Sequence, residues 1–215
     1  MFSVSGTRVL AIGAHADDLV LGCGAALARF VREGAVIQSV ILSLRMKATP
    51  SKYTTDDVMK EVIESHKILG ITAPIIKSYP NRVFPDYRQG ILEDFHSFKT
   101  TFSPDLVIAH SMADYHQDHQ VVAAECFRIF KDRTILGFNL VHNTLTTNKQ
   151  LFVSVTKEDV EKKLAAIVAY RSQKNIRPRL FSSDTAMCLL QANGVQVGLQ
   201  YAEVFDCIRL VMGGK

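Results

Sequence analysis

The chain of 215 residues has no apolar stretch that approaches the ~20 residues needed to cross a bilayer. Its first residues also lack the charged and then apolar layout of a secretory signal, so we expect a cytoplasmic protein with no membrane partner. Cysteine is scarce, and the four cysteines are far apart with no CxxC pair: Cys23, Cys126, Cys188 and Cys207. This spacing favours reduced thiols over a disulfide framework or a thiolate metal site.

A strong charge of one sign is missing too. The net charge is +4, and the basic residues are spread among acidic ones, so we expect no nucleic-acid partner, whereas an anionic small substrate is compatible. The chain has no internal repeat and no low-complexity segment. With 47% hydrophobic residues it can bury one full core, so we expect a single domain over residues 1–215, with a homo-oligomer left open.

Short apolar runs alternate with amphipathic stretches along the chain. The expected strands are residues 8–14, 35–44, 75–79, 106–109, 134–140, 151–155 and 203–212. The expected helices are residues 22–33, 56–69, 91–102, 118–130, 157–173 and 184–192, with a polar loop at 45–55. This alternation predicts an α/β fold, a Rossmann-like, doubly wound and mostly parallel sheet flanked by helices, with the strand order 3-2-1-4-5.

Polar clusters follow the first and the fourth of these strands. They are His15-Ala16-Asp17-Asp18 and His116-Gln117-Asp118-His119. In the expected order these two strands are neighbours at the point where the winding reverses, and ligands bind there beyond the carboxyl ends of the strands. Topology alone therefore predicts that the clusters converge.

The residue types in the clusters suit a divalent metal. Catalytic zinc takes three protein ligands and keeps one position for water, whose pKa falls to ~7. His15, Asp18 and His119 would supply two nitrogens and one carboxylate oxygen. The same set could hold non-haem iron as Fe2+, but a flanking base and acid favour zinc and hydrolysis.

The remaining cluster residues are candidates for catalysis. Asp17 would act as the base for the water and His116 as the acid for the leaving group, as hydrolysis of an amide requires. Asp118 would orient His116. The alternative is that the two aspartates only cap a helix and the histidines lie on the surface, but two such clusters on one sheet edge disfavour it.

Other candidates carry weaker signals. Gly22-Cys23-Gly24 resembles part of a dinucleotide fingerprint, but the third glycine is absent and no acidic residue ends the second strand. Arg82 lies in a loop on the same sheet edge and could contact a phosphate or a sugar. The basic group Lys174, Arg177 and Arg179 could bind a diphosphate, although a solvated face is the more frequent role of such a group. Structural roles are expected for His66, His96 and His142.

The two clusters and several further segments resemble the PIG-L/LmbE-like zinc deacetylases of N-acetylglucosaminyl compounds. The family's His-Pro-Asp-Asp and Leu-Gly-x-Gly signatures stand here as His15-Ala16-Asp17-Asp18 and Leu21-Gly22-Cys23-Gly24, and its His-x-Asp-His signature as residues 116–119. The similarity continues through Glu61 to Gly70, Pro80-Asn81-Arg82, Phe84, Tyr170-Arg171-Ser172-Gln173 and Ala202-Glu203-Val204-Phe205.

The resemblance implies roles for individual residues. It implies zinc bound by His15, Asp18 and His119, Asp17 as general base, and His116 as acid or oxyanion stabiliser. It also places Asn81 and Arg82 as candidates for contact with the substrate. The sequence departs from the family at Ala16, where proline is usual, and at Leu44-Arg45-Met46-Lys47, where a Thr-Asp-Gly-like turn is common.

The leading hypothesis is a zinc-dependent hydrolase that removes an N-acyl group, in the first place acetyl, from an amino sugar or its conjugate. Two alternatives remain: a catalytically inactive sugar-binding protein on the same fold, and another metal hydrolase such as a phosphoesterase. The first would be expected to have lost Asp17 or a ligand, and the second often uses more carboxylates for two metals.

Overall fold

The computed structural model describes residues 4–44, 52–146 and 148–212, so most of the Leu44-Arg45-Met46-Lys47 departure and of the loop expected at 45–55 lies outside the described residues. The strands are β1 (Arg8–His15), β2 (Val36–Ser43), β3 (Ile75–Ile76), β4 (Leu106–His110), β5 (Thr134–Phe138), β6 (Leu151–Ser154) and β7 (Ala202–Arg209). The helices are α1 (Asp18–Arg32), α2 (Thr55–Leu69), a 3-10 turn η1 (Phe84–Tyr87), α3 (Arg88–Thr101), α4 (Gln117–Ile129), α5 (Lys157–Val168), α6 (Arg171–Lys174) and α7 (Ser183–Val195).

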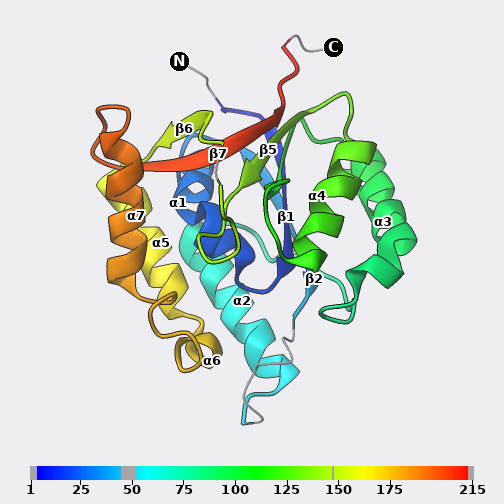
Figure 1. Ribbon diagram of the computed structural model, residues 1–215, viewed down its shortest axis with the longest axis horizontal. Helices are drawn as coiled ribbons and strands as arrows, with labels where there is room; N and C mark the ends of the chain where they lie inside the picture. Colours follow the sequence, from blue (N-terminus) through cyan, green and yellow to red (C-terminus); the bar gives the residue numbers. More distant parts are fainter. Residues whose placement is uncertain (1–3, 45–51, 147, 213–215) are drawn as a thin grey trace.

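The strands form one sheet of seven in the order β3-β2-β1-β4-β5-β7-β6 (Figure 1). The first five in this order run parallel, β7 is antiparallel to β5, and β6 is antiparallel to β7. The predicted doubly wound fold is confirmed, and β1 and β4 are neighbours as expected. The sheet is therefore mixed, with its antiparallel strands gathered at one edge.

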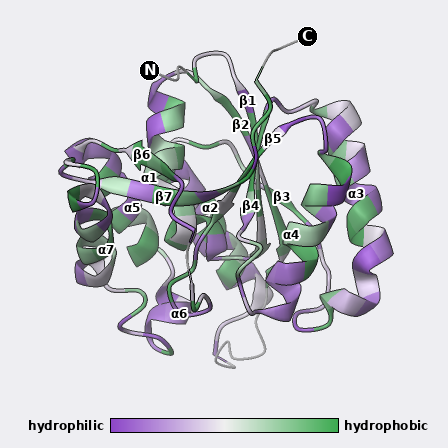
Figure 2. Cartoon of the chain, turned by 45° about the horizontal axis from the view of Figure 1, so that its top comes forward, coloured by the Kyte–Doolittle hydropathy of each residue, from purple (hydrophilic) through white to green (hydrophobic). Residues whose placement is uncertain are grey.

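Strand β1 lies at the centre and is buried on both faces. Val9 and Ala11 belong to a core packed against α1, α2, α5 and α7, whereas Leu10, Ile12 and Ala14 belong to a second core packed against α3 and α4. Figure 1 shows these two helix layers on opposite sides of the sheet. In Figure 2 the strands are mostly hydrophobic, and hydrophilic residues gather on the outer helices. The period-two alternation of apolar residues on β1 thus serves both cores.

Some element boundaries differ from those expected. Helix α1 begins at Asp18 and not at residue 22, so the carboxylate cluster is part of the helix start. The single helix expected at 157–173 is divided into α5 and α6, because Tyr170 leaves helical geometry (ψ 67°), its side chain is buried, and its hydroxyl donates to the Ala16 carbonyl at 2.6 Å. Strand β3 is two residues long where five were expected.

The helices of the described residues are either too short or too polar to span a lipid bilayer.

Candidate functional site

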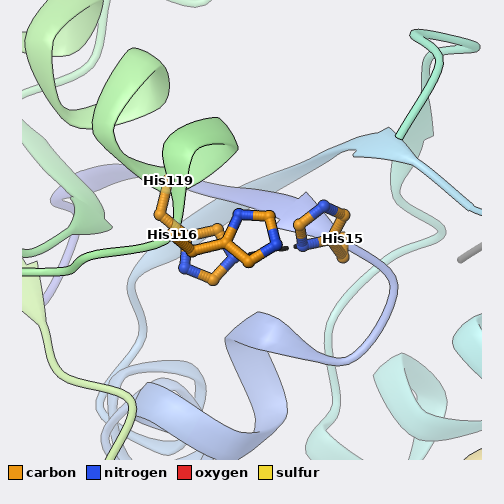
Figure 3. A group of neighbouring side chains, drawn as sticks. All are labelled: His15, His116 and His119. Carbon is orange, nitrogen blue, oxygen red and sulfur yellow. Dashed lines mark hydrogen bonds between the residues drawn. The ribbon is translucent and has the colours of Figure 1, made fainter. Parts of the chain in front are cut away.

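The two polar clusters meet at the carboxyl ends of β1 and β4. His15 is the last residue of β1, and His119 lies in the first turn of α4, which follows β4. Their ring nitrogens Nδ1 of His15 and Nε2 of His119 are 3.1 Å apart. Figure 3 shows this pair with His116, which lies beside them at the start of α4. The predicted convergence is confirmed.

A carboxylate completes a triangle of ligand atoms. The Oδ2 atom of Asp18 lies 3.4 Å from His15 Nδ1 and 3.5 Å from His119 Nε2. A tetrahedral zinc ion with ligands at about 2.0–2.1 Å would separate neighbouring ligand atoms by about 3.3–3.4 Å. The three distances of 3.1, 3.4 and 3.5 Å therefore match three edges of such a tetrahedron, and the donor set fits a zinc ion.

The second nitrogen of each of these histidines faces another carboxylate. Asp118 Oδ2 lies 3.0 Å from His15 Nε2, and Asp114 Oδ2 lies 2.9 Å from His119 Nδ1. Histidines that bind metals commonly donate their other N–H to a carboxylate, which sets the tautomer and orients the ring. Asp118 was expected to orient His116, but its carboxylate is directed to His15, because the first turn of α4 points this side chain back toward β1. Asp114 had no assigned role in the sequence.

Electrostatics favour a cation in this triangle. Burial by itself would lower the pKa of His15, but the carboxylates of Asp18 and Asp118 raise it to about 10. For Asp18, burial would raise the pKa, yet His119, His110 and His15 hold it well below its ordinary value. Without a metal, the site thus retains a proton on an imidazole between carboxylates, and metal binding would displace that proton.

Asp118 also fixes the loop that carries the two candidate substrate residues. Its Oδ2 accepts from the Arg82 backbone N–H at 2.7 Å, and its Oδ1 from the Phe84 N–H at 3.2 Å. Arg82 adopts a φ of 71°, and its side chain is exposed. Asn81 is buried, and its Oδ1 has no hydrogen-bond partner in the described part of the chain. The loop is therefore held at the site through its backbone, and substrate contact by Asn81 and Arg82 stays a prediction.

Asp17 lies beside the triangle and outside it. It is buried, and its Oδ2 finds no hydrogen-bond partner in the described residues. Burial, and then the neighbouring Asp18 charge, raise the pKa of Asp17 to about 6, against the opposing effects of His15 and Arg177. A carboxylate with a free oxygen and a pKa near neutrality is suited to accept a proton.

His116 caps α4 and is half-buried. Its Nδ1 accepts from the Asp118 backbone N–H at 3.2 Å. Its ring centre is 4.9 Å from that of His15 and 4.3 Å from that of His119. Burial and the His15 charge lower the pKa of His116. The capping bond occupies Nδ1, so Nε2 is the atom available for a ligand or a substrate, and ligand atoms of His15, His116 and His119 do lie within 4.8 Å of one another.

A further histidine at the site is His110, the last residue of β4, which was not among the candidates from the sequence. Its ring stacks on His119 at 3.9 Å, and its Nε2 lies 3.2 Å from Asp18 Oδ2 and 3.0 Å from the Ala14 backbone nitrogen. Asp18, His110 and His119 therefore form a second group with ligand atoms within 4.8 Å. The Ala14 N–H or Asp18 occupies His110 Nε2 through a hydrogen bond. The ligand atoms of His15, Asp18 and His119 face one another, so we favour these three residues as the metal site.

Two more residues that the sequence did not single out for the site act on it from a distance. Arg177 opposes the rise in the pKa of Asp17, and both Asp18 and Asp114 act on the pKa of His142, which burial and Arg177 lower. Arg177 was weighed only as part of a basic group, and His142 was expected to be structural. Chain folding after α5 and after β5 brings them to the site, and no local sequence pattern shows it.

A cavity of about 230 Å³ lies next to the site. One wall is Leu21-Gly22, one turn beyond Asp18, and another is the segment 139–144, which hydrogen-bonds to the loop of Asp114 through Tyr115 N–H and the Asn143 carbonyl. The other wall residues are of two kinds. Six are aliphatic (Ile167, Leu180, Ala186, Leu189, Leu190 and Val204), and five are polar or charged (Lys149, Lys163, Thr185, Asn193 and Glu203). No Phe, Tyr or Trp of the described residues lines it, although the imidazole-bearing His142 does.

The fold and site define an α/β protein with a His and Asp donor set that could hold a metal ion, at the switch point of its sheet. The family model described as PIG-L, GlcNAc-PI de-N-acetylase, matches residues 10–130, more than half of the chain. An Escherichia coli K12 protein named "Uncharacterized deacetylase YaiS" is 33% identical over 173 residues, which are 76% of this chain and 90% of that protein. The chain belongs to the PIG-L family, as the sequence resemblance indicated, and its deacetylase relatives indicate an enzyme of the hydrolase kind.

Solved structures agree on the fold. The N,N'-diacetylchitobiose deacetylase from Pyrococcus horikoshii superimposes with a TM-score of 0.76 at 20% identity and covers 93% of this chain and 83% of its own. The Pseudomonas putida KT2440 protein GalB, a 4-carboxy-2-hydroxymuconate hydratase, does so with a TM-score of 0.75 at 19% identity, covering 97% and 99%. Because a deacetylase and a hydratase share the architecture, the reaction must be argued from the site.

Proposed function

We propose that the protein is a zinc-dependent hydrolase that removes an acetyl group from the nitrogen of an amino sugar or its conjugate. The observation that carries the proposal is the triangle formed by His15 Nδ1, Asp18 Oδ2 and His119 Nε2, whose sides match the edges of a zinc tetrahedron. Asp17 and His116 lie beside it. Two imidazoles and one carboxylate are a donor set that catalytic zinc takes, and Fe2+ is the alternative metal for the same residues. When bound, the metal would lower the pKa of a water molecule and polarise the amide carbonyl.

The chain's own residues would then move the protons. Asp17, through its free Oδ2, would accept the proton of the attacking water and later pass it to the departing nitrogen. His116 would stabilise the developing negative charge or donate a proton through Nε2, because its Nδ1 is bound to the start of α4. Asp118 and Asp114 would hold the His15 and His119 rings in one orientation and tautomer.

The substrate would lie across the site and the adjacent cavity. Asn81, with its free Oδ1, and Arg82 lie on one side of the site and are the candidates for contact with sugar hydroxyls. On the other side, the cavity near Leu21 and the segment 139–144, with both aliphatic and polar walls, offers room for the group attached to the sugar. Because no Phe, Tyr or Trp of the described residues lines this cavity, it is a poor stacking surface for a second sugar ring.

Release of acetate from a panel of N-acetylated sugars, sugar conjugates and glycosides tests the proposal, with metal content measured on the same sample. We expect acetate release from at least one member, loss of it on chelation, and its return with Zn2+. An inactive sugar-binding protein would bind a panel member without releasing acetate. Release that is unaffected by removal of all transition metal would contradict the proposed chemistry.

A further inference from the structure

Helix α1 is two helical segments joined at Cys23. This residue has φ −145° and ψ 20°, which is outside helical geometry, so the turn Asp18–Gly22 and the segment 24–32 are separate. A break of this kind leaves carbonyls at the end of the first segment and N–H groups at the start of the second without helical partners. Ala25 and Ala26 at the start of the second segment are buried, and Leu21 at the end of the first is partly buried, so these groups need partners from elsewhere in the chain.

A buried ion pair supplies these partners. Lys163 of α5 donates to the Leu21 carbonyl at 2.8 Å, and Glu203 of β7 accepts from the N–H groups of Ala25 at 3.2 Å and Ala26 at 2.6 Å. Lys163 Nζ and Glu203 Oε1 are 2.5 Å apart, and both side chains are buried. The Lys163 ammonium thus lies at the carbonyl end of the first segment, and the Glu203 carboxylate lies at the N–H end of the second. Helix dipoles favour this arrangement of charges.

The glycines of the Leu21-Gly22-Cys23-Gly24 motif allow neighbouring side chains to pack closely around the break in α1. A Cβ atom on Gly22 would lie 2.2 Å from the ring of Phe138, and a Cβ atom on Gly24 would lie 3.3 Å from Lys163 Cγ. The Phe138 ring packs on His110 at 4.5 Å between ring centres, and His110 stacks on His119. The first segment of α1 is therefore placed from one side by the ion pair and from the other by the metal-site rings.

We propose that Lys163 and Glu203 are positioning residues: by holding the break in α1, they set the direction of its first turn and so place Asp18 against His15 and His119, with Asp17 beside them. This inference rests on the proposed metal site. The alternative is an ordinary buried ion pair that attaches α1 to α5 and β7. A second ion pair between α1 and α5 provides a control that distinguishes these two roles. Arg32 binds Asp159 with Nη2–Oδ2 at 2.9 Å at the far end of α1, 14 residues beyond Asp18, so it attaches the helix without acting on its first turn.

The test compares Glu203→Gln with the control Arg32→Met. Each protein is loaded with Co2+ as a spectroscopic probe, its Zn2+ affinity is measured by chelator competition, and kcat and KM are determined separately. We expect Glu203→Gln to bind zinc roughly 10- to 100-fold more weakly, as loss of supporting contacts around a metal does, and to show an altered Co2+ spectrum with kcat reduced more than KM is raised. Arg32→Met should lose stability only, with the parent's spectrum and affinity.

Removal of one charge leaves the other buried and unpaired, so Glu203→Gln alone could fail to fold. The double variant Lys163→Met/Glu203→Gln, neutral at both positions, then takes its place with the same expected spectral and affinity changes. A parent spectrum and parent zinc affinity in whichever of the two folds would overturn the positioning role. If the parent itself binds neither Co2+ nor Zn2+, the proposed metal site fails, and this inference fails with it.

Discussion

The two halves of the sheet contribute differently to the site. The half built from β1 to β4, within the family match at residues 10–130, carries every candidate ligand and proton-transfer residue. The half from β5 to β7 carries groups that hydrogen-bond to the backbone of this first half. Tyr170 donates to the Ala16 carbonyl, and Glu203 accepts from an N–H group of α1. The candidate reactive residues thus come from short motifs. The residues that hold these motifs in place are distant in sequence, as Glu203 is 178 positions from Ala25, from whose N–H it accepts.

The largest expected effect is in the first half. Asp18→Ala removes the carboxylate that faces both His15 and His119, so we expect loss of bound metal and a fall in activity of roughly 10³-fold or more. Elemental analysis and acetate release measured on one preparation check this. Retention of a full equivalent of zinc would show that another set, such as His15, His116 and His119, holds the metal.

Asp17→Asn distinguishes the role of Asp17 from that of Asp18. The substitution keeps the shape and removes the proton acceptor, so zinc should stay bound while turnover falls by roughly 10²-fold or more. His116→Ala should behave in the same way, with metal retained and rate lost. A metal-free Asp17→Asn protein, or one as active as the parent, would show that the roles of the two aspartates are misassigned.

The pH dependence of activity tests the same carboxylate. Asp17 must be ionised to accept a proton, and its pKa of about 6 in the metal-free site is lowered further by a bound cation. The acidic limb of kcat/KM should therefore rise with pH, with its midpoint at or below about pH 6. The residual activity of Asp17→Asn should lack this limb. A limb that persists in that variant would assign the ionisation to another group.

Tyr170→Phe examines the second half with a smaller change. The buried hydroxyl donates to the carbonyl between His15 and Asp17, so its loss leaves a buried acceptor unpaired and should cost about 1–3 kcal/mol of unfolding free energy. Denaturant titration measures this, and we expect metal to remain bound. A loss of metal as complete as that of Asp18→Ala would remove the distinction between the two halves.

The smallest expected effect concerns His66, which is remote from the chemistry. Its Nδ1 bonds to the Val62 carbonyl, its Nε2 has no partner in the described residues, and burial lowers its pKa below the ordinary 6.5. The unfolded chain therefore binds this proton more readily, so the contribution to stability is complete above about pH 6.5 and is lost as pH falls toward the folded-state pKa. The slope per group is at most about 1.4 kcal/mol per pH unit.

His66→Leu isolates this contribution. Below pH 6.5 the parent should lose stability faster than the variant, and above it the two curves should run parallel. Denaturant midpoints between pH 5 and 8 provide the measurement. Parallel curves over the whole range would mean that the imidazole titrates equally in the folded and unfolded chains.

Much of the site was predictable because metal ligands must be His or carboxylate and because parallel strands bring their ends to one edge. The convergence of the two clusters follows from those two rules, whereas His15, Asp18 and His119 as the ligand set stays a prediction. The partner of Asp118 did not follow, since a carboxylate in the first turn of a helix can face several directions, and only packing against β1 turned it to His15. Asp114 carried no distinct signal, because its loop is held by a bridge to Thr144 in another segment.

By itself, the sequence determined the alternation of strands and helices, the order of the parallel strands and the residue types at the switch point, because hydrophobic period and ligand chemistry are local properties. Tertiary structure alone decided the break in α1, the division of the helix expected at 157–173, and the approach of Arg177, Tyr170, Lys163 and Glu203 to the start of α1. Those features arise where buried polar groups must find partners, and the partners are distant in the chain and become neighbours only when the second half of the sheet packs against the first.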